Sequence, residues 1–303
     1  MKILITGGRG FIGRHLRKEL SSSDNEFFIL TRGNKEDKEG IHYIKWYWKK
    51  PDDLSDLMNN IDIVVNLAGE HIADKSWTKE QKDLIYKSRI ETTKLIVTYI
   101  NNSQKKPKKL ISASAVGIYG DRGKETITEN SSIGSGFLAH VCKDWEEEAQ
   151  KVETHHGTSQ TNVIMIRIGL VLGKDGGVLP KMLPAFKWFL GGPLGSGRQY
   201  MSWVHIDDVV GLMRFAILNE NISGALNATS PNPVTNKEFS RVIGKIIHRP
   251  SCMPIPGFGL RLLFGEMADE MLLSGQKVLP EKAVKVGYKF KYTDLEGALK
   301  RLL

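Results

Sequence analysis

Cysteine is scarce in this sequence, and long apolar runs are absent. Two cysteines, Cys142 and Cys252, occur among 303 residues, in neither a CxxC nor another metal-ligand spacing. This usage is typical of a reducing compartment and gives no support to a structural zinc site. No run of about 18 apolar residues is present to span a bilayer, and Gly7, Gly8 and Arg9 interrupt any apolar core of a signal peptide. We therefore expect a cytoplasmic protein with no membrane association and no metal site.

Positive charge exceeds negative charge. Lys and Arg number 43 against 34 Asp and Glu, a formal net charge of +9. A basic excess can attract a nucleic acid, but no nucleic-acid-binding motif accompanies it. Lys105, Lys106, Lys108 and Lys109 flank Pro107 between an expected helix and an expected strand, as in a solvated connection. We expect no nucleic-acid partner and attribute the charge to attraction of an anionic small molecule.

Short apolar runs alternate with helix-period patterns through the first half of the chain. Such runs are typical of parallel strands covered on both faces, and they predict strands at residues 2–6, 27–31, 41–45, 61–66, 109–113 and 162–167. Helical spacing predicts helices over 11–21, 78–101 and 137–154. This alternation predicts an α/β fold with a Rossmann-type, doubly wound parallel sheet.

The pattern changes after residue 168. Glycine-rich stretches at 173–177 and 191–197 separate shorter elements, and a proline-rich boundary follows at 250–256. Beyond it, helical spacing predicts helices over 260–274 and 295–302. We predict a dinucleotide-binding domain over 1–168 and a smaller substrate-side region over 169–303. That region includes a C-terminal appendage over 250–303, and its later segments are free to return to the sheet.

Residues 6–13 read Thr-Gly-Gly-Arg-Gly-Phe-Ile-Gly and fit two dinucleotide-binding patterns, GxGxxG and GxxGxxG. The stretch follows an expected strand and opens an expected helix, which is the context that gives the pattern weight. Its glycines permit a tight turn and let backbone N–H groups approach a pyrophosphate at the helix N-terminus. The expected cofactor contacts in this loop are Gly7, Arg9, Gly10, Phe11, Ile12 and Gly13.

The end of the second expected strand favours NADP(H) over NAD(H). An acidic residue at that point would bind the ribose 2′-hydroxyl of NAD, but the sequence is Thr31-Arg32-Gly33 and no carboxylate occurs before Glu36. Arg32, together with Arg9, can instead pair with a 2′-phosphate through charge-assisted hydrogen bonds. The alternative is an ordinary surface arginine after a strand.

Later motifs extend a family resemblance across nearly the whole chain. Asn66-Leu67-Ala68-Gly69 resembles the NNAG element of short-chain dehydrogenases/reductases, and residues 112–120 (SASAVGIYG) resemble the serine-bearing strand end of their extended subclass. Residues 66–78 (NLAGEHIADKSWT), 192–208 (GPLGSGRQYMSWVHIDD) and the tail from Pro250 are similar to an atypical extended group, the YfcH/SulA-like "epimerase family" related to NAD-dependent epimerases/dehydratases. The resemblance implies a Rossmann domain with a small C-terminal substrate domain and cofactor contacts from Leu67, Ala68 and Gly69. It does not by itself establish an epimerase activity.

The catalytic pattern of that superfamily is incomplete here. The resemblance implies a Ser, a Tyr that acts as general acid/base, and a Lys four residues after the Tyr that binds the nicotinamide ribose and lowers the Tyr pKa. The corresponding helix contains Lys143, and the residue four positions before it is Ala139. Lys143 is the expected ribose ligand, and the proton-transfer group has to come from elsewhere.

Three replacements for the missing tyrosine are open. His140 has a suitable pKa but lies about 100° around the helix from the tyrosine direction. Tyr119 follows the serine strand and could either reach the site or pack beneath it. Glu70 and His71 follow the fourth expected strand, near the carboxyl edge of the sheet where ligands bind.

Ser114 is the expected hydrogen-bond donor to a substrate oxygen, with Ser112 as its competitor, and either serine could simply cap a strand end. We thus name as catalytic candidates Ser114, Lys143, Glu70 and His140. Trp77 and Arg89 lie in or near a family-specific stretch, and chemistry alone assigns them no role.

A polar cluster before residue 208 is the expected substrate side. An arginine such as Arg198 could bind a phosphate or carboxylate in bidentate fashion, and in the resembling enzymes such a cluster contacts the nucleotide part of a sugar-nucleotide substrate. The expected substrate contacts are Tyr119, Arg198, Ser202 and Trp203. The Asp pair at 207–208 is expected to cap a helix that runs to residue 218.

Two functions remain open. The first is an NADP(H)-dependent oxidoreductase or epimerase that acts on a small substrate, such as a nucleotide-linked sugar, with a nonstandard acid/base. The second is a non-catalytic NADPH-binding sensor or regulator, which explains an intact cofactor loop beside Ala139. The long helices over 78–101 and 137–154 could pair with a second copy in a four-helix homodimer interface.

Overall fold

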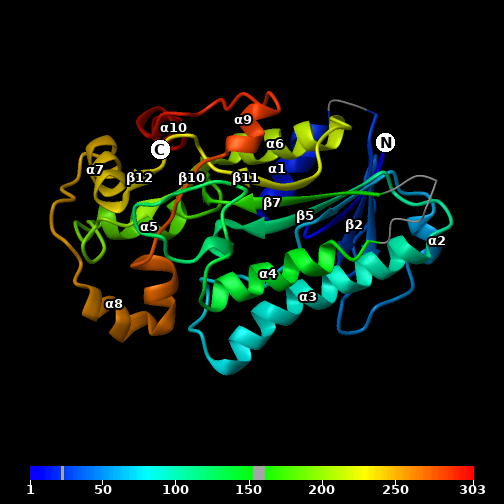
Figure 1. Cartoon of the computed structure of the whole chain (residues 1–303), viewed down its shortest axis with the longest axis horizontal. Helices are drawn as coiled ribbons and strands as arrows, with labels where there is room; N and C mark the ends of the chain where they lie inside the picture. Colours follow the sequence, from blue (N-terminus) through cyan, green and yellow to red (C-terminus); the bar gives the residue numbers. More distant parts are fainter. Residues whose placement is uncertain (22–23, 153–160) are drawn as a thin grey trace.

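A computed structural model describes residues 1–21, 24–152 and 161–303 of the chain (Figure 1). Within these residues seven parallel strands form the main sheet, in the order β11-β7-β5-β4-β1-β2-β3. The order reverses between β1 and β4, as in a doubly wound Rossmann sheet. The predicted fold class is confirmed. The strands are β1 Lys2–Thr6, β2 Glu26–Thr31, β3 Ile41–Lys45, β4 Ile63–Asn66, β5 Lys109–Ala115, β7 Asn162–Ile168 and β11 Gly224–Ala228.

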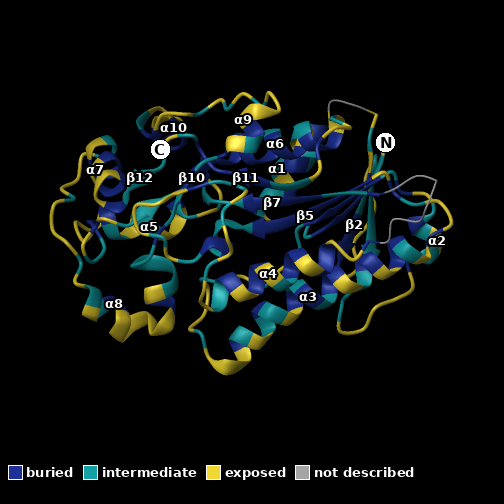
Figure 2. Cartoon of the chain, in the orientation of Figure 1, coloured by how far each residue is buried: buried dark blue, intermediate teal, exposed yellow. Residues whose placement is uncertain are grey.

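Helices cover both faces of this sheet. On one face lie α1 (Phe11–Leu20) and α6 (Ile206–Leu218), and on the other lie α2 (Ser55–Met58), α3 (Lys79–Asn102) and α4 (Phe137–Ala149) (Figure 1). Successive strand residues point to opposite faces, so Ile3 and Ile5 pack in one core while Leu4 packs in the other. Figure 2 shows the strands buried between helices whose outer faces are exposed. Double coverage explains the near-continuous apolar strands of the sequence.

The first lysine of β5 is buried rather than solvated. Lys109 Nζ donates hydrogen bonds to the carbonyl oxygens of Ala216, Ile217 and Asn219 at 2.7, 2.9 and 2.6 Å. A cation there satisfies the free carbonyl groups at the end of α6 and complements the helix dipole. Burial lowers the pKa of Lys109 from its ordinary value. The predicted solvated connection was wrong for this residue.

The chain after Ile168 both returns to the sheet, through α6 and β11, and builds a second core. This core joins α5 (Leu179–Lys187), α7 (Asn236–Ile246) and α10 (Leu295–Leu302), and these helices lie together at the left of Figure 1. Two short strand pairs support it: β8 (Leu170–Leu172) with β10 (Trp203–His205), and β9 (Tyr200–Met201) with β12 (Val234–Thr235). A third pair, β6 (Thr126–Ile127) with β13 (Lys277–Val278), packs in a separate small cluster with Ile118 and Tyr119. The substrate-side role of this region stays a prediction.

Helix ends differ from the sequence prediction at three places. The helix expected over 260–274 is interrupted: α8 covers Gly257–Phe264, a π-helix (η2) covers Ala268–Leu272, and Gly265 between them has φ +56°, a left-handed conformation that ends α8. The short helix α9 (Glu281–Lys285) follows. The helix expected over 137–154 ends at Ala149, and residues 153 and 154 lie outside the described residues.

The third difference is the cap of α6. His205, and not the aspartate pair, caps the helix, because its Nδ1 accepts the Asp207 N–H at 3.1 Å. Asp208 is buried instead, and its carboxylate accepts the N–H groups of Lys291 and Tyr292 at 2.7 and 2.9 Å. The pair therefore divides: one carboxyl lies in the first turn of α6, and the other holds the segment before α10.

None of the helices in the described part of the chain combines the length and apolar character that crossing a membrane requires. The helices α3 and α4 lie side by side over one face of the sheet (Figure 1). A homodimer through them stays a prediction.

Candidate functional site

The loop between β1 and α1 can be built only with glycines at its tightest points. Gly7 has φ +67°, and a Cβ on it would come 2.7 Å from the carbonyl oxygen of Leu67. A Cβ on Gly13 would come 2.6 Å from the carbonyl oxygen of Gly7. The loop therefore packs backbone against backbone, both on the end of β4 and on the start of α1. At Gly7 and Gly13, therefore, no side chain covers the backbone of the loop.

The N-terminus of α1 opens onto this loop. The helix begins after Gly10 without a side-chain cap and has no acidic residue in its first turn. The first N–H groups of a helix have no intrahelical acceptor, and they form the positive end of the helix dipole. Arg17 reaches back along the helix, where its Nε donates to the carbonyl oxygen of Gly8 at 3.1 Å. The glycine cradle and the uncapped helix end together fit a dinucleotide pyrophosphate.

A buried bridge ties the glycine loop to the end of β4. Thr6 Oγ1 donates to Asn66 Oδ1 at 2.6 Å and accepts the N–H groups of Leu67 and Ala68, both at 3.2 Å. Asn66 Nδ2 in turn donates to Thr93 Oγ1 on α3 at 2.8 Å. The bridge holds Leu67 and Ala68, with Gly69 after them, beside the loop, so the structure brings these predicted cofactor residues together.

Two exposed arginines lie at neighbouring strand ends. Arg9 is in the glycine loop and Arg32 follows β2, the neighbour of β1 in the sheet. In the part of the chain that the structure describes, neither guanidinium forms an ion pair. The carboxylate of Asp37, which follows Arg32 in the chain, has other partners: it accepts the Tyr43 N–H at 2.8 Å and contacts His42. The edge around β2 thus offers cations to a phosphate.

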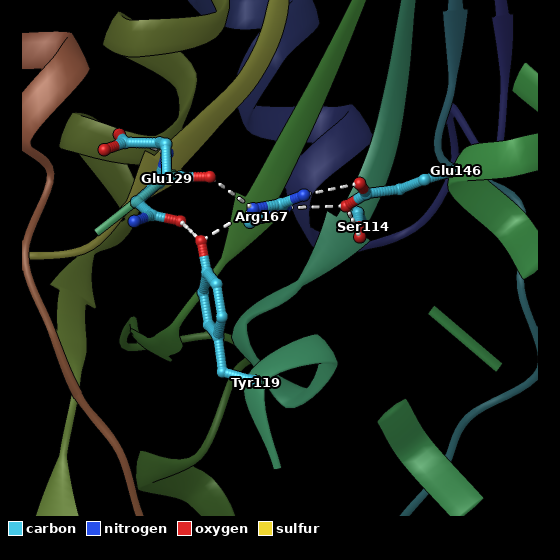
Figure 3. Close-up of polar contacts among 6 residues, drawn as sticks. Ser114, Tyr119, Glu129, Glu146 and Arg167 are labelled. Atoms are coloured by element: carbon cyan, nitrogen blue, oxygen red, sulfur yellow. Dashed lines mark hydrogen bonds and ion pairs between the residues drawn. The ribbon is translucent and has the colours of Figure 1, made fainter. Parts of the chain in front are cut away.

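Ser114, at the end of β5, belongs to a buried charged network (Figure 3). Its hydroxyl donates to Glu146 Oε1 at 2.6 Å, and the same carboxylate receives Arg167 Nε and Nη2, both at 2.8 Å. The side chains of Arg167 and Glu146 are only 10% and 6% exposed. A serine hydroxyl has one proton to donate, and Ser114 uses it within the protein.

Tyr119 closes the other end of the network. Its hydroxyl accepts from Arg167 Nη1 at 2.8 Å and donates to Asn227 Oδ1 at 2.8 Å, while Arg167 also donates to the Glu129 carbonyl oxygen at 3.2 Å (Figure 3). Tyr119 is fully buried, and burial raises the pKa of its phenol. Its surroundings favour the packing role among the alternatives considered for it. Ser112 is also buried in β5.

The helix α4 turns a different face to β5 than the Lys143 alignment requires. Glu146 contacts Ser114, and Cys142 is buried against Ala115. Leu138 packs next to Gly117, where a Cβ on the glycine would come 3.4 Å from Leu138 Cβ. These residues are spaced by four, as one stripe of a helix requires. Lys143 is next to the stripe and points outward, where it is 47% exposed and lies 3.6 Å from Glu147.

The other acid/base candidates lie in two places. His140, also on α4, is 63% exposed, stacks on Tyr86 and lies 3.4 Å from Asp144. Glu70 follows the end of β4 and is half-buried, and its N–H donates to Ser88 Oγ at 2.9 Å. His71 is 78% exposed. Of the four catalytic candidates, Glu70 alone extends the carboxyl end of β4 beside the glycine loop.

Apart from Tyr119, the predicted substrate contacts comprise two buried residues and one exposed residue. Ser202 is buried, donates to the carbonyl oxygen of Gln276 at 2.6 Å and accepts the Val278 N–H at 2.9 Å. Trp203 is fully buried, and its indole N–H donates to a backbone carbonyl oxygen at 3.0 Å. Arg198 is exposed. The structure therefore presents Arg198 to solvent and packs Ser202 and Trp203 inside.

Comparison with known proteins decides the family. A sequence model of the NAD dependent epimerase/dehydratase family matches residues 3–228. The chain belongs to this family. A second model, a domain of unknown function, matches residues 255–302 at the end of the epimerase-family chain. The region predicted as a C-terminal appendage thus contains a recurring domain.

Relatives within the epimerase family match over the full length. Epimerase family protein YfhF of Bacillus subtilis is 39% identical, covering 100% of this chain and 98% of the relative, and an Arabidopsis thaliana chloroplastic homologue of SDR39U1 is 41% identical, covering 100% and 87%. The crystal structure of human epimerase family protein SDR39U1 with NADPH matches with a TM-score of 0.87 and 31% identity, covering 100% of this chain and 99% of that chain. A Bacillus cereus UDP-glucuronic acid 4-epimerase shares the fold, with a TM-score of 0.77 at 17% identity.

Sequence reasoning missed the Ser114–Glu146–Arg167 network of this epimerase-family protein. A signal existed, because Arg167 is a charged residue inside the apolar strand β7. A buried charge needs a partner, but the sequence did not show which acidic residue supplies it. Arg89, left without a role, is the second omission: its guanidinium lies against the backbone of Gly69.

Proposed function

We propose that this chain binds NADP(H) in preference to NAD(H). The observation that carries the proposal is the glycine cradle, which opens onto the uncapped start of α1 and has two exposed guanidinium groups, Arg9 and Arg32, beside it. The cradle would hold the pyrophosphate, and the guanidinium groups would bind the 2′-phosphate through bidentate hydrogen bonds. NADPH in the human relative's crystal structure supports the same cofactor here.

We propose further that the bound cofactor serves an oxidoreduction or epimerisation of a small hydroxyl or carbonyl substrate, such as a nucleotide-linked sugar. When bound, the nicotinamide supplies or accepts a hydride. Glu70 is the proton-transfer group we favour, because it is half-buried and continues from the end of β4, where ligands of such sheets bind. Ser114 is held by Glu146 and has no proton left to donate, and Lys143 is turned to solvent.

An isotope-transfer experiment tests this activity. The protein is loaded with NADPH carrying deuterium at the transferable C4 position and mixed with a metabolite extract, and mass spectrometry follows deuterium gain. We expect a labelled product from wild type and at least a tenfold smaller yield from Glu70→Gln at unchanged NADPH affinity. Label transfer that is unaffected by Glu70→Gln would contradict the role of Glu70 while leaving the hydride chemistry in place.

A non-catalytic NADPH sensor or regulator is the second candidate. It is favoured by the α4 stripe facing β5, which carries Leu138, Cys142 and Glu146 and so offers neither a tyrosine nor a lysine. On this alternative the same experiment gives no label transfer from a protein that demonstrably binds NADPH. Such a result would replace the oxidoreductase proposal with the sensor.

A further inference from the structure

Arg89 lies beneath the exposed edge of the site. It projects from α3, and its guanidinium packs on Gly69: a Cβ on that glycine would come 2.9 Å from Arg89 Cζ and 3.1 Å from Nη2. On its other side the guanidinium lies 5.2 Å from the centre of the Trp145 ring. Gly69 itself is exposed. With no side chain on Gly69, little more than one backbone segment separates this cation from a ligand on the sheet edge.

The charge of Arg89 is only partly balanced by the protein. Nη1 donates to the carbonyl oxygen of Ile85 at 2.9 Å, and in the described residues no carboxylate lies within ion-pair distance of the guanidinium. Burial lowers the pKa of Arg89, and Cys142 and Glu70 oppose this only through space. Cys142 is no counterion at neutral pH, because burial raises the pKa of its thiol to about 11.

The contrast with Arg167 is informative. Arg167 is buried whereas Arg89 is half-buried, and Glu146 pairs with the Arg167 guanidinium in bidentate fashion at 2.8 Å. A half-buried cation without such a partner leaves part of its desolvation cost uncompensated. Groups with this kind of perturbation gather at ligand sites. The Arg89 guanidinium packs against Gly69 at the edge where ligands of a doubly wound sheet bind, so its charge would act on a ligand bound there.

The position of Arg89 selects one half of a dinucleotide. In a doubly wound sheet the cofactor crosses the switch point, here between β1 and β4, with one nucleotide on each side. Arg32, at the end of β2, lies on the adenosine side, and Gly69, after β4, lies on the opposite side with Arg89 below it. The cation therefore belongs to the nicotinamide half.

We propose that Arg89 makes the nicotinamide half of the site favour the reduced cofactor over the oxidised one. This inference rests on the proposed function, that the chain binds NADP(H). The oxidised nicotinamide ring carries a positive charge and the reduced ring is neutral, so the Arg89 cation penalises only the oxidised form. Glu70, which follows Gly69 and acts on Arg89 through space, offsets only part of this penalty because it forms no ion pair with the guanidinium. Charge repulsion over several ångströms in such a medium amounts to about tenfold or more in relative affinity.

The test measures the ratio of the dissociation constants for NADP⁺ and NADPH, by NADPH fluorescence titration and its displacement by NADP⁺. Wild type is compared with Arg89→Met, Arg89→Lys and the matched control Lys87→Met. Lys87 is on the same helix, is 50% exposed and pairs with Asp83. We expect wild type to bind NADPH about tenfold or more tightly than NADP⁺. Arg89→Met should lower this ratio about tenfold, Arg89→Lys should keep it, and the control should leave it unchanged.

Several results would overturn the inference. If Arg89→Met weakens both forms equally, or changes neither, Arg89 has only a structural role. If wild type binds the two forms equally, or NADP⁺ more tightly, the inference fails whether or not the Arg89 variants fold. Failure of wild type to bind either form is a different outcome, because it refutes the proposed function itself.

Discussion

Replacing Glu146 with glutamine should destabilise the protein strongly. The change keeps the shape of the side chain but leaves the buried Arg167 guanidinium without its anionic partner and disturbs the acceptor of Ser114. Burial alone would lower the pKa of Arg167, yet the hydrogen bonds and charge of Glu146 raise it. Breaking a buried pair costs about 3–5 kcal/mol. We expect the lower end, about 3 kcal/mol, because the amide oxygen of glutamine can still accept one hydrogen bond.

The assay is urea unfolding followed by circular dichroism, with thermal unfolding as a second probe. A loss of about 3 kcal/mol corresponds to a fall in Tm of roughly 5 °C in a chain of 303 residues. The matched control is Glu147→Gln on the same helix, since Glu147 is 57% exposed and an exposed pair contributes about 1 kcal/mol or less. If Glu146→Gln costs no more than the control, the network does not hold β5, β7 and α4 together as we argue.

Three further changes test other parts of the structure. Gly7→Ala should cost about 1–3 kcal/mol in urea unfolding, because the residue has φ +67° and a Cβ would lie 2.7 Å from a carbonyl oxygen. The variant should also bind NADPH more weakly in a fluorescence titration. Unchanged stability would refute the argument that the loop is too tight for a side chain. Lys143→Met should leave the NADPH dissociation constant within about twofold, since the side chain is 47% exposed; a loss beyond about tenfold would restore it as the ribose ligand. Hydrogen bonds from Lys245 and Lys300 lower the pKa of Glu296 from 4.5 to about 2. The contribution of Glu296 to folding stability is therefore complete above pH 4.5 and is lost as the pH falls toward 2. The Tm difference between wild type and Glu296→Gln should shrink over that range, and a constant difference would contradict the assignment.

The sequence was sufficient for features encoded over short distances. The apolar runs predicted six strands of the main sheet, and the glycine spacing located the loop, because a strand covered on both faces and a turn against a helix start leave local patterns. The paired strands of two or three residues, such as β9 and β12, leave no such periodicity. The interruption of α8 depends on one backbone conformation at Gly265.

Side-chain partners across long stretches of sequence were not predictable. Ser114, Glu146 and Arg167 come from three separate elements, and only the assembled sheet and α4 bring them together. The motif alone could not give the orientation of Lys143, because a shift of one residue along a helix rotates a side chain by about 100°. The sequence drew attention to Arg89 but assigned it no role, because the role that we propose depends on its contact with Gly69.

The central claim, NADP(H) binding at the glycine loop with Arg32 on the 2′-phosphate, is tested most directly by titrating wild type and Arg32→Glu with NADPH and with NADH. Arg32 is exposed, so the variant should fold normally, and it replaces a cation by an anion beside the phosphate. We predict that wild type binds NADPH at least about tenfold more tightly than NADH, and that Arg32→Glu weakens NADPH binding by about tenfold or more while NADH binding changes little. Equal affinity of wild type for the two cofactors, or an equal effect of Arg32→Glu on both, would contradict the account.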